Sequence, residues 1–405
     1  MKIEHRIEVN YAGAQSSFWI GLCALTGFTA VLLGSRGLND VQVGYTSSLL
    51  SVLTIVFQLI ISNFSDQRPH IALRKIIAVL YLLAMTSGAV LLSGGIPIAL
   101  LMIMFAMGGA FKGTIIGLFN ALAMQYVNAG IPVRIGWPRG TASVVYAVCA
   151  YVLGRLIEIY SPDILVPVFL CATVVSIILV LIMPDVSTLT DRSTPAFQQD
   201  RDAARISYRQ MLSGNTPLLL FLLAGVVLYS GQTTAFLFLV RVVESRGGGA
   251  AELGLSMFIQ AGVEMPIMFL SPWILKRFKP GNTLVFAYFA YAFKTFLLLI
   301  SRSMSVVYIS MSVNIFSFGL YCISSVYFVN GLVRPGERVR AQGLVALCGA
   351  AGGIIGSVFA GQVLEDYGIQ TLLTINTLIS LSSAFIMMLC NKTSQNYAPK
   401  PLPGN

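Results

Sequence analysis

Long apolar runs separated by short polar turns dominate the chain. Each run is about as long as the roughly 20 residues that an α-helix needs to cross the hydrocarbon core of a bilayer. The breaks carry turn-forming residues, as in Gly94-Gly95-Ile96-Pro97 and Lys279-Pro280-Gly281-Asn282. The pattern therefore predicts an all-α membrane protein with twelve transmembrane helices. The expected spans are 16–34, 43–64, 74–93, 97–127, 134–158, 163–183, 216–239, 253–275, 282–301, 304–331, 341–363 and 369–390.

One polar stretch is much longer than the others and divides six predicted spans from six. It is rich in Ser, Thr, Asp, Arg and Gln, a composition typical of a linker. We therefore expect an N-terminal six-helix bundle at 1–183, a cytoplasmic linker at 184–215, a C-terminal six-helix bundle at 216–391 and a cytoplasmic tail at 392–405.

Composition and charge agree with a membrane protein. The chain is 56% hydrophobic and only 10% charged, whereas soluble proteins have about 25% charged residues. The net charge of +10 reflects lysines and arginines that gather on one side, in Arg68 to Lys75, in the linker, in Lys276 to Lys279 and in Arg334 to Arg340. By the positive-inside bias, we expect a multi-pass protein of the cytoplasmic (inner) membrane with both termini in the cytoplasm, and no nucleic-acid partner.

The sequence offers little that points to catalysis, a metal or a cofactor. Its six cysteines include no CxxC pair, and the two histidines, His5 and His70, lie outside the predicted spans. No GxxxxGK[ST] loop is present, so we do not expect this chain to use ATP. We expect a protein that is not an enzyme and that binds neither metal nor cofactor.

Four charged residues stand inside predicted spans and away from the span ends: Glu264, Lys112, Arg139 and Lys294. Glu264 is the acid placed deep in an apolar run. An ionised carboxylate at mid-bilayer costs roughly 2.5–3.5 kcal/mol, so such residues are usually kept for function. One carboxylate cannot neutralise three cations. Either a lysine is neutral at rest, or the substrate brings negative charge.

The two halves of the chain resemble each other. Each has a basic turn after its second predicted span, and each opens its fifth with an arginine and small residues, as in Arg139-Gly140-Thr141-Ala142-Ser143 and Arg340-Ala341-Gln342-Gly343. Parallel six-span repeats around a midplane cavity are the architecture of the major facilitator superfamily. In the eleventh predicted span, Gly349, Gly352, Gly353 and Gly356 predict a face for close helix packing.

Three segments carry a closer resemblance. FQLIISNFSDQRPHIALRK (57–75) resembles the loop between the second and third helices of the superfamily, particularly in the lactose permease and oligosaccharide:proton symporter group. IGWPRGTAS (135–143) and GVEMPIMFLSPWILKRF (262–278) resemble the fifth-helix and eighth-helix segments of that group, and nucleoside:proton symporters look similar. The resemblance implies that Arg139 and Glu264 bind substrate. We expect a gate at the cytoplasmic helix ends, formed by Asp66, Arg68, Arg74 and Lys75.

The chain also departs from that group. The tenth predicted helix lacks the group's histidine and second glutamate and offers Asn314 instead. In the seventh, Tyr229 and Gln232 stand in a stretch without the group's aspartates. Glu264 is therefore the one core acid left to couple a proton to transport.

These observations predict a secondary active transporter that couples protons to the symport of a small polar solute, a sugar or a nucleoside, by alternating access. We expect it to work as a monomer in the lipid bilayer. The alternatives are a proton-coupled importer of an organic anion or acidic solute, an exporter of sugars or drugs, and a non-transporting sensor on the same fold. Glu264 could also be only a structural ion-pair partner of Lys294. The predicted substrate-binding residues are Arg139, Glu264, Lys294, Lys112, Gln232, Tyr229, Asn120 and Asn314, with Glu264 also coupling the proton.

Overall fold

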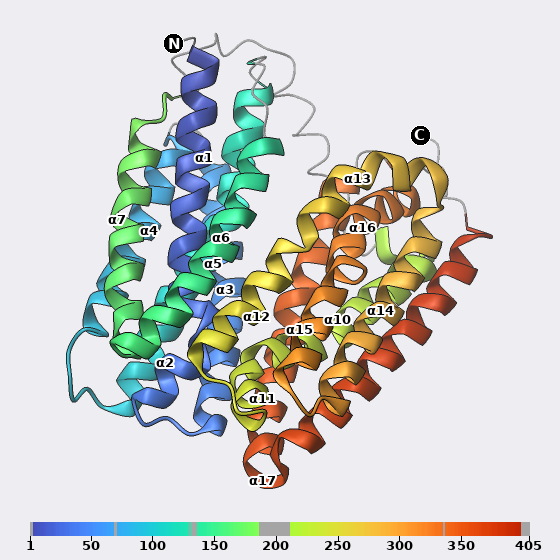
Figure 1. Ribbon diagram of the computed structural model, residues 1–405. Coiled ribbons are helices and arrows are strands. Elements are labelled where there is room, and N and C mark those ends of the chain that lie inside the picture. Colours follow the sequence, from blue (N-terminus) through green and yellow to red (C-terminus); the bar gives the residue numbers. More distant parts are fainter. Residues whose placement is uncertain are drawn as a thin grey trace. The chain divides into compact units, whose positions relative to one another are not determined.

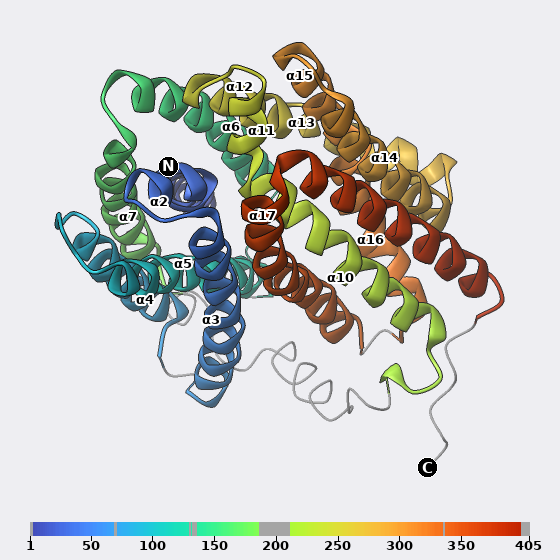
Figure 2. The ribbon, with the colours of Figure 1, turned by 90° about the horizontal axis from the view of Figure 1, so that it is seen from below.

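The computed structural model describes residues 3–68, 71–128, 131, 136–185, 211–334 and 337–397, and every regular element in these ranges is a helix (Figures 1 and 2). Within these ranges, nine helices are long and apolar enough to cross a membrane, or ten if a bent pair near the start of the chain is one span. The predicted all-α membrane class is confirmed. The linker 186–210 and the end of the tail, 398–405, lie outside the described residues.

The chain forms two compact units, and the first consists of Met1–Ala196 together with Leu239–Gly262. This unit therefore contains a segment from the second half of the sequence. The predicted C-terminal bundle includes that segment, so the compact units and the sequence-based division differ there. The helices of the first unit are α1 (Ile3–Leu22), α2 (Thr29–Ser35), α3 (Asp40–Gln67), α4 (Leu73–Val90), α5 (Ile98–Asn128), α6 (Gly136–Ile159), α7 (Leu165–Ile182), α11 (Leu239–Ser245) and α12 (Ala250–Gly262).

Two contacts hold α11 and α12 within the first unit. Helix α12 packs against α6 at a pair of glycines, and a Cβ atom on Gly154 would lie 2.5 Å from the main-chain oxygen of Ala250 and 2.9 Å from the Cα atom of Gly254. Only glycine permits so close an approach. The guanidinium of Arg241 in α11 donates to the carboxylate of Asp40 at the start of α3, at 2.8 and 3.0 Å.

The first span is bent. A π-helical turn at Cys23–Gly27 follows α1, and at Phe28 the chain bends by 52° into α2. Helices α2 and α11 then end in the same way. Gly37 and Gly247 both have positive φ, 86° and 78°, and the next residue donates back to Leu33 or Val243 at 3.1 and 3.0 Å. This is the left-handed glycine cap that closes many helices.

The second unit consists of Phe197–Phe238 and Val263–Asn405. Its last helix, α17, extends over 57 residues and is interrupted by one non-helical residue, Gly368, with φ 77°. Its two arms are visible in Figure 2 and contain the predicted spans 341–363 and 369–390. The helices of the second unit are α10 (Thr216–Leu237), α13 (Glu264–Arg277), α14 (Pro280–Ile300), α15 (Met304–Ser312), the 3₁₀ turn η4 (Val313–Ile315), α16 (Phe318–Leu332) and α17 (Arg338–Ser394).

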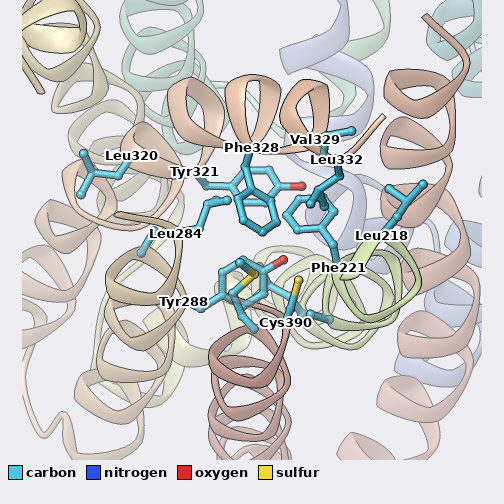
Figure 3. Packing of buried hydrophobic residues seen from close by; sticks show 14 of the residues in the cluster. Leu218, Phe221, Leu284, Tyr288, Leu320, Tyr321, Phe328, Val329, Leu332 and Cys390 are labelled. Atoms are coloured by element: carbon cyan, nitrogen blue, oxygen red, sulfur yellow. The ribbon is translucent and has the colours of Figure 1, made fainter. Parts of the chain in front are cut away.

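Aromatic side chains fill the core of the second unit. Phe221 of α10, Tyr288 of α14 and Tyr321 and Phe328 of α16 meet in one cluster (Figure 3). Helix α17 packs so closely against α10 that a Cβ atom on Gly352 would lie 2.7 Å from the main-chain oxygen of Val226. The predicted glycine packing face is confirmed there.

Candidate functional site

Three of the predicted site residues meet inside the second unit, and two of them stand at breaks in apolar helices. Glu264 is the first residue of α13, directly after the turn at Val263 that ends α12. Asn314 lies in η4, the turn that separates α15 from α16. Lys294 comes from the uninterrupted helix α14. Helix breaks at membrane depth are typical of transporter binding sites, where irregular main chain lines a polar site.

A chain of hydrogen bonds joins these three side chains. The amide nitrogen Nδ2 of Asn314 donates to Oε1 of Glu264 at 2.6 Å, and Nζ of Lys294 donates to Oδ1 of Asn314 at 2.9 Å. The hydroxyl of Ser317 also donates to Oδ1, at 3.4 Å. Asn314 is only 2% exposed and Lys294 only 6%, whereas Glu264 is half-buried. The carboxylate is therefore the member of the group with the most exposed surface.

The arrangement balances charge through a neutral group. A carboxylate and an ammonium of opposite sign share one amide, whose two ends suit them because the nitrogen donates and the oxygen accepts. Hydrogen bonds to ionised groups are stronger in a medium of low dielectric constant, so the group stabilises two charges that would each be costly alone. A proton added to Glu264 would remove the negative charge that balances Lys294 in this group.

A set of tyrosines extends this group. Tyr291 stands one helical turn before Lys294 on α14, is 4% exposed, and lies within electrostatic range of both Glu264 and Tyr229. The rings of Tyr229 and Tyr321 meet edge to face, with centroids 5.9 Å apart. Sequence reasoning missed Tyr291, although its spacing of three residues from Lys294 placed it on the same helix face.

Three other predicted substrate-binding residues belong to α10, α5 and α6. The side-chain amide of Gln232 donates to the hydroxyl of Ser380 at 3.2 Å, which joins α10 to α17. Asn120 is exposed on α5. Arg139 belongs to the first turn of α6, but its side chain lies outside the described residues.

Lys112 lies in the first unit, and it is fully buried there. Its ammonium donates to the main-chain oxygen of Phe18 at 3.2 Å. It also lies over three aromatic rings, 4.9 Å from the centroid of Phe18, 5.3 Å from that of Tyr81 and 5.5 Å from that of Phe169. With no exposed surface, Lys112 offers nothing to a solute in this structure, and its neighbours come from α1, α4 and α7.

The residues of the predicted gate have separate roles in the structure. The guanidinium of Arg74, at the start of α4, donates to the main-chain oxygens of Leu181 and Met183 and pairs with Asp185 at 3.8 Å, which ties α4 to the end of α7. Arg68 lies over the ring of Phe64, 5.1 Å from its centroid. Lys75 is exposed, and the side chain of Asp66 lies outside the described residues.

Long apolar helices that break at a half-buried acid and at a buried amide are typical of multi-pass membrane transporters. Residues 17–375 match the model of the MFS_1 like family, and the chain belongs to that family of major facilitator transporters. No curated protein sequence matches the chain.

Solved transporter structures share the fold. The nucleoside transporter NupG superimposes with a TM-score of 0.76 at 15% identity, over 98% of this chain and 100% of its own. A bacterial homologue of the human lysosomal transporter Spinster gives 0.72 at 12% identity, over 99% and 100%. The human organic anion transporter MFSD10 gives 0.63 at 16% identity, over 95% and 99%.

Proposed function

We propose that this protein is a proton-coupled symporter that imports a small, uncharged polar solute, a nucleoside or a sugar, by alternating access. The observation that carries the proposal is the hydrogen-bonded chain from Glu264 through Asn314 to Lys294 at two helix breaks. An ionisable acid in a membrane helix marks a proton or substrate pathway by default. We place the protein in the cytoplasmic membrane as a monomer, with both termini in the cytoplasm.

The proposed cycle uses the charge balance of this group. Deprotonated Glu264 balances Lys294 through Asn314. A proton from outside neutralises Glu264, so the ammonium of Lys294 becomes available to a substrate oxygen. Arg139 stays a predicted substrate ligand, because a guanidinium is a planar fork that can grip neighbouring oxygens. The loaded site then opens to the cytoplasm, where the substrate leaves and Glu264 releases its proton.

The preference for an uncharged solute follows from the neighbours of the two lysines. From the sequence, excess positive charge in the core favoured an anion as one alternative. In the structure, Lys112 is enclosed by aromatic rings and Lys294 shares its amide partner with Glu264. The site built around Glu264 thus holds one ammonium, which loses its balancing negative charge when Glu264 takes up a proton. The hydroxyl oxygens of a neutral solute can accept hydrogen bonds from that ammonium, so a neutral solute suffices to bind there.

The two solute classes have different support among known structures. NupG is described as a nucleoside transporter, which favours a nucleoside here. MFSD10 is described as an organic anion transporter, which favours an acidic solute as the second candidate. Counterflow into proteoliposomes, with neutral nucleosides, neutral sugars and sugar acids offered separately, distinguishes them. Exchange of sugar acids alone would establish the second candidate, and no exchange by folded protein would favour a sensor.

Coupling is tested with Glu264→Gln. We expect this variant to lose accumulation driven by an imposed pH gradient while it keeps counterflow exchange, because binding survives and the proton step does not. Glu365→Gln removes an exposed acid on α17 and should behave like the wild type. A Glu264→Gln protein that still accumulates solute against its gradient would overturn the proposed coupling.

A further inference from the structure

The side chain of Asn314 is fixed in one orientation by its partners. Its nitrogen must point to Glu264, which accepts, and its oxygen must point to Lys294, which donates. Turning the amide over would place two donors against each other at Lys294 and two acceptors at Glu264. The hydroxyl of Ser317, one turn along, donates to the same oxygen. The break at η4 therefore presents an oriented dipole between two charges of opposite sign.

We infer that Asn314 is a positioning residue that sets the pH at which Glu264 takes up and releases its proton. The inference rests on the proposed function, because it assigns the control of the proton step to a residue that carries no proton itself. Asn314 acts on Glu264 directly, by donating to the ionised carboxylate, and indirectly, by holding the ammonium of Lys294 next to that carboxylate.

The physical reason is the low dielectric constant around a side chain that is 2% exposed. A hydrogen bond given to the charged form of an acid favours that form, and so does a nearby positive charge. Without the amide, the carboxylate loses its donor, and the ammonium loses the oxygen that holds it in place. Both changes favour the protonated acid, so the proton would be held up to a higher pH.

Among the described residues, few other titratable groups face Glu264. Helix α14 contributes Lys294 and Tyr291, the second through its hydroxyl. Behind Tyr291 stand Tyr229 of α10 and Cys322 of α16, and Tyr288 lies one turn before it. On α13 itself, the other charged residues, Lys276 and Arg277, are at the far end of the helix. Cys348 of α17 faces Tyr229 and Tyr288 rather than Glu264.

The experiment is an infrared pH titration of purified, full-length protein, which needs no substrate. The carboxylic acid band that disappears in Glu264→Gln is assigned to Glu264, and its midpoint is then compared between the wild type and Asn314→Leu. Leucine keeps the volume of asparagine and removes both hydrogen bonds. We expect the midpoint to rise by about one pH unit. Asn282→Leu, an exposed position on α14, is the matched control and should leave the midpoint unchanged.

Further results separate the possible failures. If Asn314→Leu does not fold, Asn314→Ser removes the same bridge in a smaller side chain and should also raise the midpoint. An unchanged midpoint in a folded Asn314 variant would overturn the inference. If Glu264→Gln still accumulates solute while Asn314→Leu still raises the midpoint, the proposed coupling is overturned and the role of Asn314 stands. A wild-type carboxyl band that does not titrate would overturn both.

Discussion

The two compact units each bury a lysine in a membrane helix, and they stabilise it in different ways. In the second unit, Lys294 donates to Asn314, which in turn donates to a carboxylate. In the first unit, Lys112 donates to a main-chain oxygen and lies over three aromatic rings. The first lysine is linked through an amide to a carboxylate, whereas the second is enclosed by a main-chain oxygen and aromatic rings.

This difference indicates which lysine can respond to a proton. The charge balance of Lys294 changes whenever Glu264 gains or loses a proton, so the pair can alternate between two states. The aromatic faces around Lys112 stabilise a cation by their quadrupoles, an effect that does not depend on the protonation of a neighbouring acid. A buried charge near a site is therefore a functional candidate only when its partners can change as well.

The largest expected effect separates the two lysines. We expect Lys294→Met to reduce pH-driven uptake by at least about 100-fold, because it leaves the carboxylate of Glu264 buried without its cation. Lys112→Met should keep uptake within about threefold of the wild type, and its thermal stability should be equal or higher, since a buried charge is replaced by an apolar chain of similar length.

Uptake and thermal unfolding of both variants, measured in the same lipid, check this contrast. A folded Lys112→Met protein that no longer binds solute would show that Lys112 reaches the substrate in another step of the cycle. The comparison between the two lysines would then fail.

A smaller effect tests how tightly the aromatic enclosure is packed. A Cβ atom on Gly21 of α1 would lie 2.5 Å from Nζ of Lys112. Gly21→Ala should therefore lower the free energy of unfolding by about 1–3 kcal/mol through overpacking, despite the better helix propensity of alanine. Gly34→Ala, where nothing lies within 4 Å of the added atom, should be neutral or stabilising. Equal melting temperatures for the two variants would mean that Lys112 moves aside easily.

The smallest effect concerns Glu337, a carboxylate outside the spans that is stabilised by hydrogen bonds from Arg334. Burial raises the pKa of Glu337, but hydrogen bonds from the side chain and main chain of Arg334 outweigh it and hold this pKa below its ordinary value. A lowered carboxyl pKa contributes stability above the unfolded value of about 4.3, and this stability is lost as the pH falls. Glu337→Gln should lower the melting temperature by a few degrees at pH 7 and have little effect below about pH 4. A difference that persists in acid would contradict the ion-pair explanation.

Much of the fold could be predicted from the sequence, because long apolar runs between turn residues permit few structures in a bilayer. The spacing of glycines in the eleventh predicted span also predicted a close-packing face, and Gly352 does pack against α10. The helix breaks were not predicted. Asn314 lies in the predicted span 304–331, which contains no proline, and the serines near Asn314 do not by themselves signal that the helix is interrupted at η4.

For the site, sequence reasoning selected Glu264, Lys294 and Asn314, and the structure brings these three together. It could not separate Lys112 from them, because a buried lysine has the same local pattern whether its neighbours are carboxylates or rings. Those neighbours, Phe18, Tyr81 and Phe169, are distant in the sequence. Only tertiary packing distinguishes the two lysines.

The glycine turns that end α2 and α11 match each other in both sequence and geometry. Ser35-Arg36-Gly37 and Ser245-Arg246-Gly247 have the same three residues, and in each the serine hydroxyl donates to the main-chain oxygen three residues earlier, at 2.9 and 2.7 Å. Such a match between separate parts of one chain is what duplication of an ancestral half would leave behind. The two turns have the same geometry although the buried lysines of the two units differ, since Lys112 lies over aromatic rings and Lys294 is joined through an amide to a carboxylate.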